Sequence, residues 1–271
     1  MRYGFCTGFA TDPMFSIDSS LEAAVSLWGF DYIEYPLMSI AALSEADFCN
    51  LRERLQRAHL ACDCMCNLFP ASVPVIGERV NEKQIREYLD TAFGRAAILG
   101  VKKLIFGSAG ARKRGGLAKE TADRQFLASL LILEEYCSRY RMQVLLEAIR
   151  VGEADYINTL SEGAEMVILA QKAGCTHIAL MADLFHMNSN GEDCLDLKKY
   201  FPLIRHIHIC ETERKLPSQP VSDSLRQETE LLQSLQYNLT ASYESIMPVN
   251  DAQGKHALSL LKSMLHESPQ E

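Results

Sequence analysis

The sequence has 271 residues, of which 48% are hydrophobic and 23% are charged, and its formal net charge is −8. This balance is typical of a soluble globular protein and excludes a disordered or fibrous chain. The acidic excess, with no long run of lysine and arginine, argues against a nucleic acid as a partner, because nucleic acids bind basic surfaces. No uninterrupted apolar stretch reaches the roughly 20 residues that span a bilayer, so we expect no membrane partner.

Short apolar or β-branched runs alternate along the chain with longer stretches of helical periodicity. Strands are predicted at residues 2–6, 32–35, 62–66, 103–106, 143–147, 177–181, 204–209 and 239–243. Helices are predicted near residues 17–28, 44–58, 81–99, 119–140, 157–172, 194–200, 223–235 and 251–266. Strict alternation of this kind predicts parallel strands joined by right-handed crossovers.

Local signals mark several of the helix ends. Ser44 precedes acidic residues and Asn81 begins an amphipathic run, so both are predicted N-caps. Gly29, Gly100 and Gly174 each stand just before a predicted strand, as expected where a left-handed residue ends a helix.

Eight strand–helix units in a chain of this length predict a closed (β/α)8 barrel, since barrels of this class have roughly 250 residues. An open, doubly wound parallel sheet is the alternative. No linker rich in Pro, Gly or Ser divides the sequence, and we therefore expect residues 1–271 to form one domain.

The expected compartment is the cytoplasm. Residues 1–5 lead directly into a predicted strand and show no apolar signal-peptide core. The nine cysteines are odd in number and irregularly spaced, which predicts mostly reduced, buried thiols.

Metal-ligand side chains stand at the ends of the last four predicted strands. They are Glu147, Asp183, His208 and Glu244. A parallel barrel gathers the carboxyl ends of its strands on one rim, where three carboxylates would repel one another unless a cation neutralised them. Oxygen and imidazole ligands suit Mn²⁺, Mg²⁺ or Co²⁺. The alternative is that each acidic residue only caps the helix that follows it.

Five segments resemble the xylose isomerase-like TIM barrels, and specifically their branch of ketose 3-epimerases and sugar phosphate isomerases and epimerases. Residues 180–188 (LMADLFHMN) carry the most specific part of the likeness. The others are residues 146–153 (LEAIRVGE), 206–209 (HIHI), 67–70 (NLFP) and 106–112 (FGSAGAR).

The resemblance implies that Glu147, Asp183, His208 and Glu244 hold one divalent metal ion and that the two glutamates form the acid/base pair. It also implies substrate contacts from Glu153, His186 and Arg214, a sugar or sugar phosphate as the ligand, and a homodimer or homotetramer. The chain departs from the family pattern at Ala148, Arg150 and Val151, where Pro, Asn and Arg are usual. These departures concern the choice of substrate.

The chemistry that such a site predicts is proton abstraction next to a ketone. The resulting enediolate needs a Lewis acid to stabilise its charge, and epimerisation needs a base on each face of the substrate. Glu147 and Glu244 meet that need, which predicts an epimerase or isomerase. A lyase that dehydrates a polyol or keto acid on the same scaffold is the alternative. A non-catalytic sugar-binding barrel and the related endonuclease IV branch, which needs more histidines, are less favoured.

Several residues have a plain structural alternative. His186 could be a surface residue before a loop, Arg214 a solvated charge, and Asn67 a loop cap instead of a ligand for a sugar hydroxyl. The single tryptophan, Trp28, is expected to pack against a helix.

Two further clusters are considered as sites. Residues Cys62, Cys64 and Cys66 alternate along a strand, so we expect all three on one side facing an apolar layer and not a zinc site. The basic loop of residues 112–116 (RKRGG) could receive a phosphate on its glycine-rich backbone, but a solvated loop is preferred.

Overall fold

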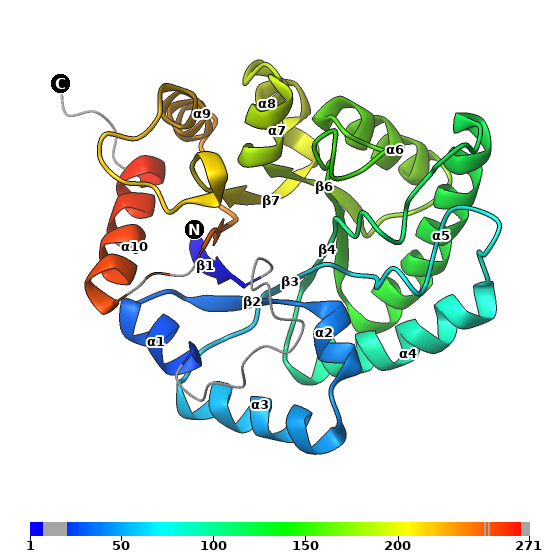
Figure 1. Cartoon of the computed structure of the whole chain (residues 1–271), viewed down its shortest axis with the longest axis horizontal. Coiled ribbons are helices and arrows are strands. Elements are labelled where there is room, and N and C mark those ends of the chain that lie inside the picture. The colour runs from blue at the N-terminus through cyan, green and yellow to red at the C-terminus, as the bar shows by residue number, and fades with distance from the viewer. Residues whose placement is uncertain (8–20, 247, 249, 267–271) are drawn as a thin grey trace.

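Eight parallel strands close into one barrel in chain order (Figure 1). The computed structural model describes residues 1–7, 21–246, 248 and 250–266. The strands are β1 (Arg2–Cys6), β2 (Tyr32–Pro36), β3 (Cys64–Cys66), β4 (Lys103–Phe106), β5 (Gln143–Leu146), β6 (Ile178–Asp183), β7 (Ile204–Ile209) and β8 (Thr240–Glu244). Because β8 pairs with β1, the predicted (β/α)8 barrel is confirmed and the open sheet is excluded.

Helices surround the barrel (Figure 1). They are α1 (Leu21–Trp28), α2 (Leu37–Ala42), α3 (Glu45–Arg57), α4 (Glu82–Ile98), α5 (Lys119–Tyr140), α6 (Leu160–Lys172), α7 (Leu184–Asn190), α8 (Leu195–Tyr200), α9 (Asp223–Ser234) and α10 (Asp251–His266). The sequence analysis missed α2 and α7, because they follow their strands directly and are too short to show an amphipathic period. Residues 17–20, which were included in the first predicted helix, lie outside the described residues.

The predicted helix ends are largely confirmed. Ser44 accepts a hydrogen bond from a main-chain N–H group of α3, and Asn81 does the same for α4. Gly29, Gly100 and Gly174 have φ angles of 93°, 81° and 102°, as the expected left-handed residues do. The helix predicted to begin at residue 157 begins at Leu160 instead, since the preceding threonine forms a capping box with the first turn.

One apolar layer lies outside the sheet of the barrel and a second lies inside it. The outer layer joins strands to helices, and within it the Trp28 ring contacts Phe5 edge-on at 5.7 Å. Its Nε1 donates to Asp251 of α10 at 2.9 Å, which confirms that Trp28 packs against a helix. The inner layer fills the barrel with Cys6, Tyr32, Cys64, Cys66, Ile105, Leu145, Ala179 and Met181.

The cysteine-rich strand differs from the prediction. β3 begins only at Cys64, and Cys62 belongs to the outer layer, so the expectation that all three cysteines share one side is wrong for Cys62. The inner environment is also partly polar, because Cys64 Sγ lies 4.0 Å from His206 Nδ1. All nine cysteines are free and seven are buried.

Parallel closure decides where a site can form, since it places the carboxyl ends of all eight strands on one rim. Among the described residues, no helix is both long and apolar enough to cross a membrane.

Candidate metal and substrate site

Four buried side chains meet at the carboxyl end of the barrel. Asp183 and Glu244 are the last residues of β6 and β8, Glu147 directly follows β5, and His208 lies near the end of β7. One ligand atom from each residue lies within 4.8 Å of those of the other three. Metal–ligand bonds of about 2.0–2.2 Å place two ligand atoms about 3–4.4 Å apart, so this spacing suits one shared cation.

The imidazole of His208 turns one nitrogen into this cluster. Its Nδ1 lies 3.4 Å from Glu244 Oε2 and 3.8 Å from Glu147 Oε1, and it makes no hydrogen bond to any described residue. A buried ring nitrogen without a partner, beside carboxylates, fits a metal ligand. Burial lowers the pKa of His208, but Glu34 and Glu244 outweigh that effect and raise the pKa well above its usual value.

The two glutamates of the cluster have opposite pKa shifts. Burial raises the pKa of Glu147 to about 8, and the negative charges of Glu244 and Asp183 add to the rise. Burial acts in the same direction on Glu244, but Arg214 and His208 outweigh it and hold the pKa of Glu244 well below its usual value. Two carboxyl groups with pKa values pushed apart are the pattern of an acid/base pair.

Arg214 lies against the cluster and not in solvent. Its side chain is buried, and its Nη1 donates hydrogen bonds to the carboxylates of Asp183 and Glu244. Its Nη2 lies 3.0 Å from His186 Nε2, and its guanidinium stacks on the Phe185 ring at 4.1 Å. The alternative of a solvated charge is therefore wrong, and the predicted substrate contact stays a prediction.

Asp183 uses its two oxygens differently. Oδ1 accepts hydrogen bonds from the main-chain N–H groups of Phe185 and His186, so Asp183 is the N-cap of α7. Oδ2 lies 2.9 Å from Arg214 Nη1, at the cluster. The capping alternative thus holds for Asp183, and it does not exclude a ligand role because the second oxygen is separate.

α7 carries His186 into the site. The His186 side chain is buried, and its Nε2 lies 3.5 Å from Asp183 Oδ2 and 4.0 Å from Glu147 Oε1. Its interpretation as a surface residue before a loop is wrong. Burial lowers the pKa of His186 in spite of Asp183 nearby, which favours the neutral imidazole.

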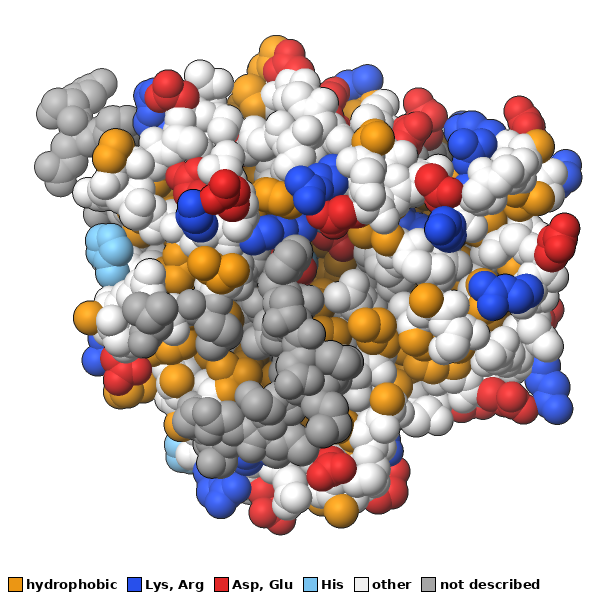
Figure 2. Space-filling model, in the orientation of Figure 1, with side chains coloured by type: hydrophobic (Ala, Val, Ile, Leu, Met, Phe, Trp, Pro, Cys, Tyr) orange, Lys and Arg blue, Asp and Glu red, His pale blue; other side chains and the backbone are white. Residues whose placement is uncertain are grey.

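The other two predicted substrate contacts are less buried than the cluster residues. Glu153 is exposed and pairs with Arg150 at 2.6 Å, and it lines a cavity of about 480 Å³ together with Arg214 and Phe185. Asn67 directly follows β3 with a φ of 47°, a left-handed conformation that asparagine tolerates. Figure 2 shows acidic and basic side chains side by side above the centre of this face.

The sequence matches the family model of the xylose isomerase-like TIM barrel over residues 21–230. The chain belongs to this family. No match was found among curated proteins.

Solved structures share the barrel at low sequence identity. A D-psicose 3-epimerase in the presence of D-fructose superimposes with a TM-score of 0.82 and 15% identity, over 98% of this chain and 100% of the other. The 3-keto-D-glucoside 4-epimerase YcjR from E. coli has a TM-score of 0.78 and 18% identity, over 97% and 99% of the two chains. The IolI protein with a binding zinc atom has a TM-score of 0.72 and 17% identity, over 98% of each chain.

The sequence analysis missed one charged residue inside this xylose isomerase-like barrel. Glu34 lies within β2, its side chain is completely buried, and it contacts His208. Burial raises the pKa of Glu34, but His208 and His206 outweigh it and hold the pKa far below its usual value. The available signal was a lone carboxylate in the otherwise uncharged strand YIEYP, since such a residue is almost never fully buried without a partner.

Gly107 is a second missed position. A Cβ at this residue would lie 2.0 Å from Glu147 Oε2, so the glycine leaves the space that the carboxylate occupies. Gly107 directly follows β4, within the segment 106–112 that resembles the family.

The basic loop is not solvated throughout, and part of its backbone is already paired. Arg112 is completely buried, and its Nη2 donates to the main-chain oxygen of Glu147 at 2.8 Å. The N–H groups of Arg114 and Gly115 donate to the two carboxylate oxygens of Asp155, at 2.8 and 2.7 Å. Asp155 therefore takes two of the backbone donors that a phosphate would need.

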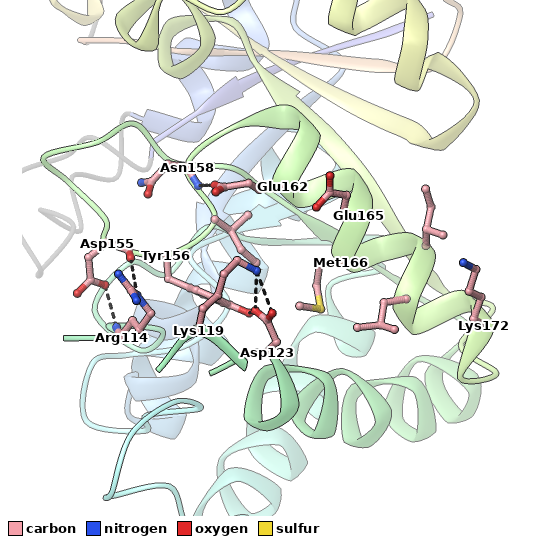
Figure 3. A pocket seen from close by; sticks show the side chains of 13 residues that line it. Arg114, Lys119, Asp123, Asp155, Tyr156, Asn158, Glu162, Glu165, Met166 and Lys172 are labelled. Atoms are coloured by element: carbon pink, nitrogen blue, oxygen red, sulfur yellow. Dashed lines mark hydrogen bonds and ion pairs between the residues drawn. The ribbon is translucent and has the colours of Figure 1, made fainter. Parts of the chain in front are cut away.

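A separate cavity of about 500 Å³ lies between α5 and α6 and contains none of the four cluster residues (Figure 3). Its polar groups are largely paired with one another. Lys119 forms an ion pair with Asp123 at 2.9 Å, and the hydroxyl of Tyr156 donates to the same carboxylate at 2.7 Å.

Proposed function

We propose that the protein is a divalent-metal-dependent carbohydrate epimerase or aldose–ketose isomerase that removes a proton from the carbon next to the carbonyl of a ketose. The observation that carries this proposal is the convergence of Glu147 and Glu244 with Asp183 and His208 in one buried cluster. Membership of the xylose isomerase-like family supports it, and so do the epimerase names of similar structures.

The proposed cation ligands are Glu147, Asp183, His208 and Glu244. Three carboxylates and one imidazole suit a hard or borderline ion such as Mn²⁺, Mg²⁺ or Co²⁺. When bound, the cation supplies Lewis acidity, which stabilises negative charge on the oxygens of the substrate.

The two glutamates would move the proton. One carboxylate accepts it as the C–H bond breaks and the electron pair passes into an enediolate, and a carboxyl group then returns a proton to carbon. Return to the same carbon from the opposite face inverts its configuration. Return to the neighbouring carbon, with a proton passing from one enediolate oxygen to the other, interconverts a ketose and an aldose. Proton transfer by a positioned side chain contributes about 10²–10⁴-fold to such a rate.

Other residues would bind the sugar. Arg214 and His186 lie against the cluster and are proposed to donate hydrogen bonds to substrate oxygens. Glu153, which lines the adjoining cavity, and Asn67 are proposed as further substrate contacts. The adjoining cavity is lined by both basic and acidic residues, which are Arg150, Arg214, Glu153, Glu211 and Glu213. This mixed charge favours an uncharged sugar over a sugar phosphate.

The test is incubation with a panel of ketoses and their phosphates in deuterated water with Mn²⁺, followed by mass spectrometry or NMR. We expect deuterium at the carbon next to the carbonyl, and loss of that label in Glu147→Gln and Glu244→Gln proteins. Products that have lost water would favour the lyase instead. Absence of both reactions across the panel, in protein shown to bind Mn²⁺, would contradict the proposal.

A further inference from the structure

Glu34 is a buried carboxylate whose close side-chain contacts are histidines and a serine. Its Oε1 lies 3.0 Å from His208 Nε2. Its Oε2 accepts a hydrogen bond of 2.7 Å from the hydroxyl of Ser242 and lies 3.3 Å from His206 Nε2. No lysine or arginine among the described residues forms an ion pair with it. A buried charge with neither a cation nor a function is costly, so these contacts need an explanation.

The chemistry of imidazole gives that explanation. A neutral imidazole has one N–H donor and one lone pair, on different nitrogens. An ionised carboxylate only accepts hydrogen bonds, so the contact with Glu34 requires the proton of His208 on Nε2. A histidine that binds a metal must be neutral, and its lone pair is then on Nδ1, the atom that faces Glu147 and Glu244 at 3.8 and 3.4 Å.

We infer that Glu34 is a positioning residue, which holds His208 with its proton on Nε2 and its Nδ1 lone pair directed at the metal cluster. This inference rests on the proposed metal site. Carboxylates that accept from a ligating histidine orient its ring and raise its basicity, and their loss typically weakens metal binding by about 10–100-fold.

The barrel interior in turn holds Glu34 in place. The hydroxyl groups of Ser242 and Tyr32 are 2.9 Å apart, so the serine has a neighbour on the side away from Glu34. Gly4 leaves room for this pair, because a Cβ there would lie 2.1 Å from the Tyr32 ring and 2.6 Å from Ser242 Oγ. His206 is itself held by Thr240, whose hydroxyl lies 2.7 Å from its Nδ1.

The first test measures the affinity of the metal-free protein for Mn²⁺ by isothermal titration calorimetry. In Glu34→Gln the side chain keeps its size but loses its charge, and we expect the Kd to rise about 10–100-fold. Glu34→Asp keeps the charge at a greater distance and should recover part of the affinity. This partial recovery separates an electrostatic and orienting role from simple packing.

Glu22→Gln is the matched control. Glu22 is also buried, but it lies on α1 outside the barrel and binds Arg54 and Tyr35. We expect its substitution to lower thermal stability and leave the Kd for Mn²⁺ unchanged. If Glu34→Gln binds Mn²⁺ as tightly as wild type, or weakens it only as much as Glu22→Gln does, the inference is overturned and the proposed function is not. If wild type binds no divalent metal, both are overturned.

A second measurement needs no variant at position 34. In Zn²⁺-loaded wild-type protein labelled with ¹⁵N-histidine, long-range ¹H–¹⁵N spectra report which ring nitrogen carries the proton. The His208 signals are assigned by their loss in His208→Gln. We expect a proton on His208 Nε2, and a His208 ring with no proton on Nε2 would overturn the inference even if Glu34→Gln fails to fold.

Discussion

Two residues that take no part in the proposed proton transfer decide whether the carboxylate of Glu147 can occupy its position. Gly107 is the clearest case, because Glu147 Oε2 fills the space that a side chain at position 107 would need. Arg112 holds the main chain of the same glutamate, because its Nη2 donates a hydrogen bond of 2.8 Å to the main-chain oxygen of Glu147. The position of this proposed acid/base group thus depends on a glycine and a buried arginine that follow β4.

Gly107→Ala should displace the Glu147 carboxylate. We expect a loss of about 1–3 kcal/mol in the free energy of unfolding from the steric overlap. A displacement of about 1 Å should reduce the rate of deuterium incorporation about 10²-fold. Both are measurable on purified protein, by urea unfolding and by the exchange assay.

Gly94→Ala is the control for this substitution. Gly94 lies in the interior of α4, and a Cβ there would meet no atom within 4 Å. It should stabilise the protein by about 0.5–1 kcal/mol without changing exchange. Equal exchange rates in the two alanine variants would contradict the role given to Gly107.

At the scale of elements, the short helix α7 both contributes to the packing of the fold and positions residues of the site. It begins at Asp183, carries His186 on its first turn, and contacts α9 through Asn188, whose amide donates to Glu228 at 3.0 Å. A strand that ends in a cap residue therefore places a proposed ligand and a proposed substrate contact within one helical turn.

Asp183→Asn and Asp183→Ala should separate the two roles of this residue. Asparagine caps a helix about as well as aspartate, whereas alanine loses the cap at about 0.5–2 kcal/mol. In urea unfolding of the metal-free proteins, we expect the alanine variant to be less stable than the asparagine variant by that amount. Both variants should lose Mn²⁺ binding to the same extent. Retained binding in Asp183→Asn would argue against Asp183 as a ligand.

Glu228 should make the stability of the α7–α9 contact depend on pH. Burial raises its pKa to about 8 from the ordinary value of 4.5. Between these values the folded protein holds a proton that the unfolded chain has lost, so the free energy of unfolding falls as pH rises, by about 1.4 kcal/mol per pH unit for one such group. Below pH 4.5 both states are protonated, and this contribution is fully present.

Glu228→Gln cannot titrate and should lose this part of the pH dependence. We compare urea unfolding of metal-free protein at pH 5.5 and pH 7.5. Between these pH values, the free energy of unfolding of the variant should rise relative to that of wild type by on the order of 2 kcal/mol. Other titrating groups, including Glu147, remain in both proteins and cancel in the difference. Parallel pH profiles would show that Glu228 is ionised in the folded state.

At the scale of the whole molecule, barrel closure concentrates negative charge on one rim. Asp183, Glu147 and Glu244 converge there within a chain that is already acidic, and Arg214 balances only part of their charge. A cation that binds only the folded barrel must therefore stabilise the whole fold.

Saturating Mn²⁺ should raise the thermal midpoint of unfolding. At a free concentration of 100 times Kd the stabilisation is about 2.7 kcal/mol, which corresponds to about 5–10 °C for a protein of this size. Differential scanning fluorimetry with Mn²⁺ or with a chelator measures this shift. Asp183→Asn should show none, and an equal shift in that variant would indicate binding elsewhere.

Most of the fold was predictable because it rests on local patterns. The strand positions, the capping residues Ser44 and Asn81 and the helix-ending glycines follow from periodicity and turn preferences of nearby residues. Errors occurred where tertiary context prevailed, as at Cys62, which turns toward the helices although it alternates with Cys64 and Cys66.

The sequence alone determined the barrel and the four residues grouped at its rim, since strand order and strand ends can be read from alternation along the chain. Only the tertiary structure decided what surrounds them. The burial of Arg112, the contact of Glu34 with His208 and the space left by Gly107 join residues from different strands. Such contacts depend on which side chains face inward after the barrel closes, and no local pattern records that.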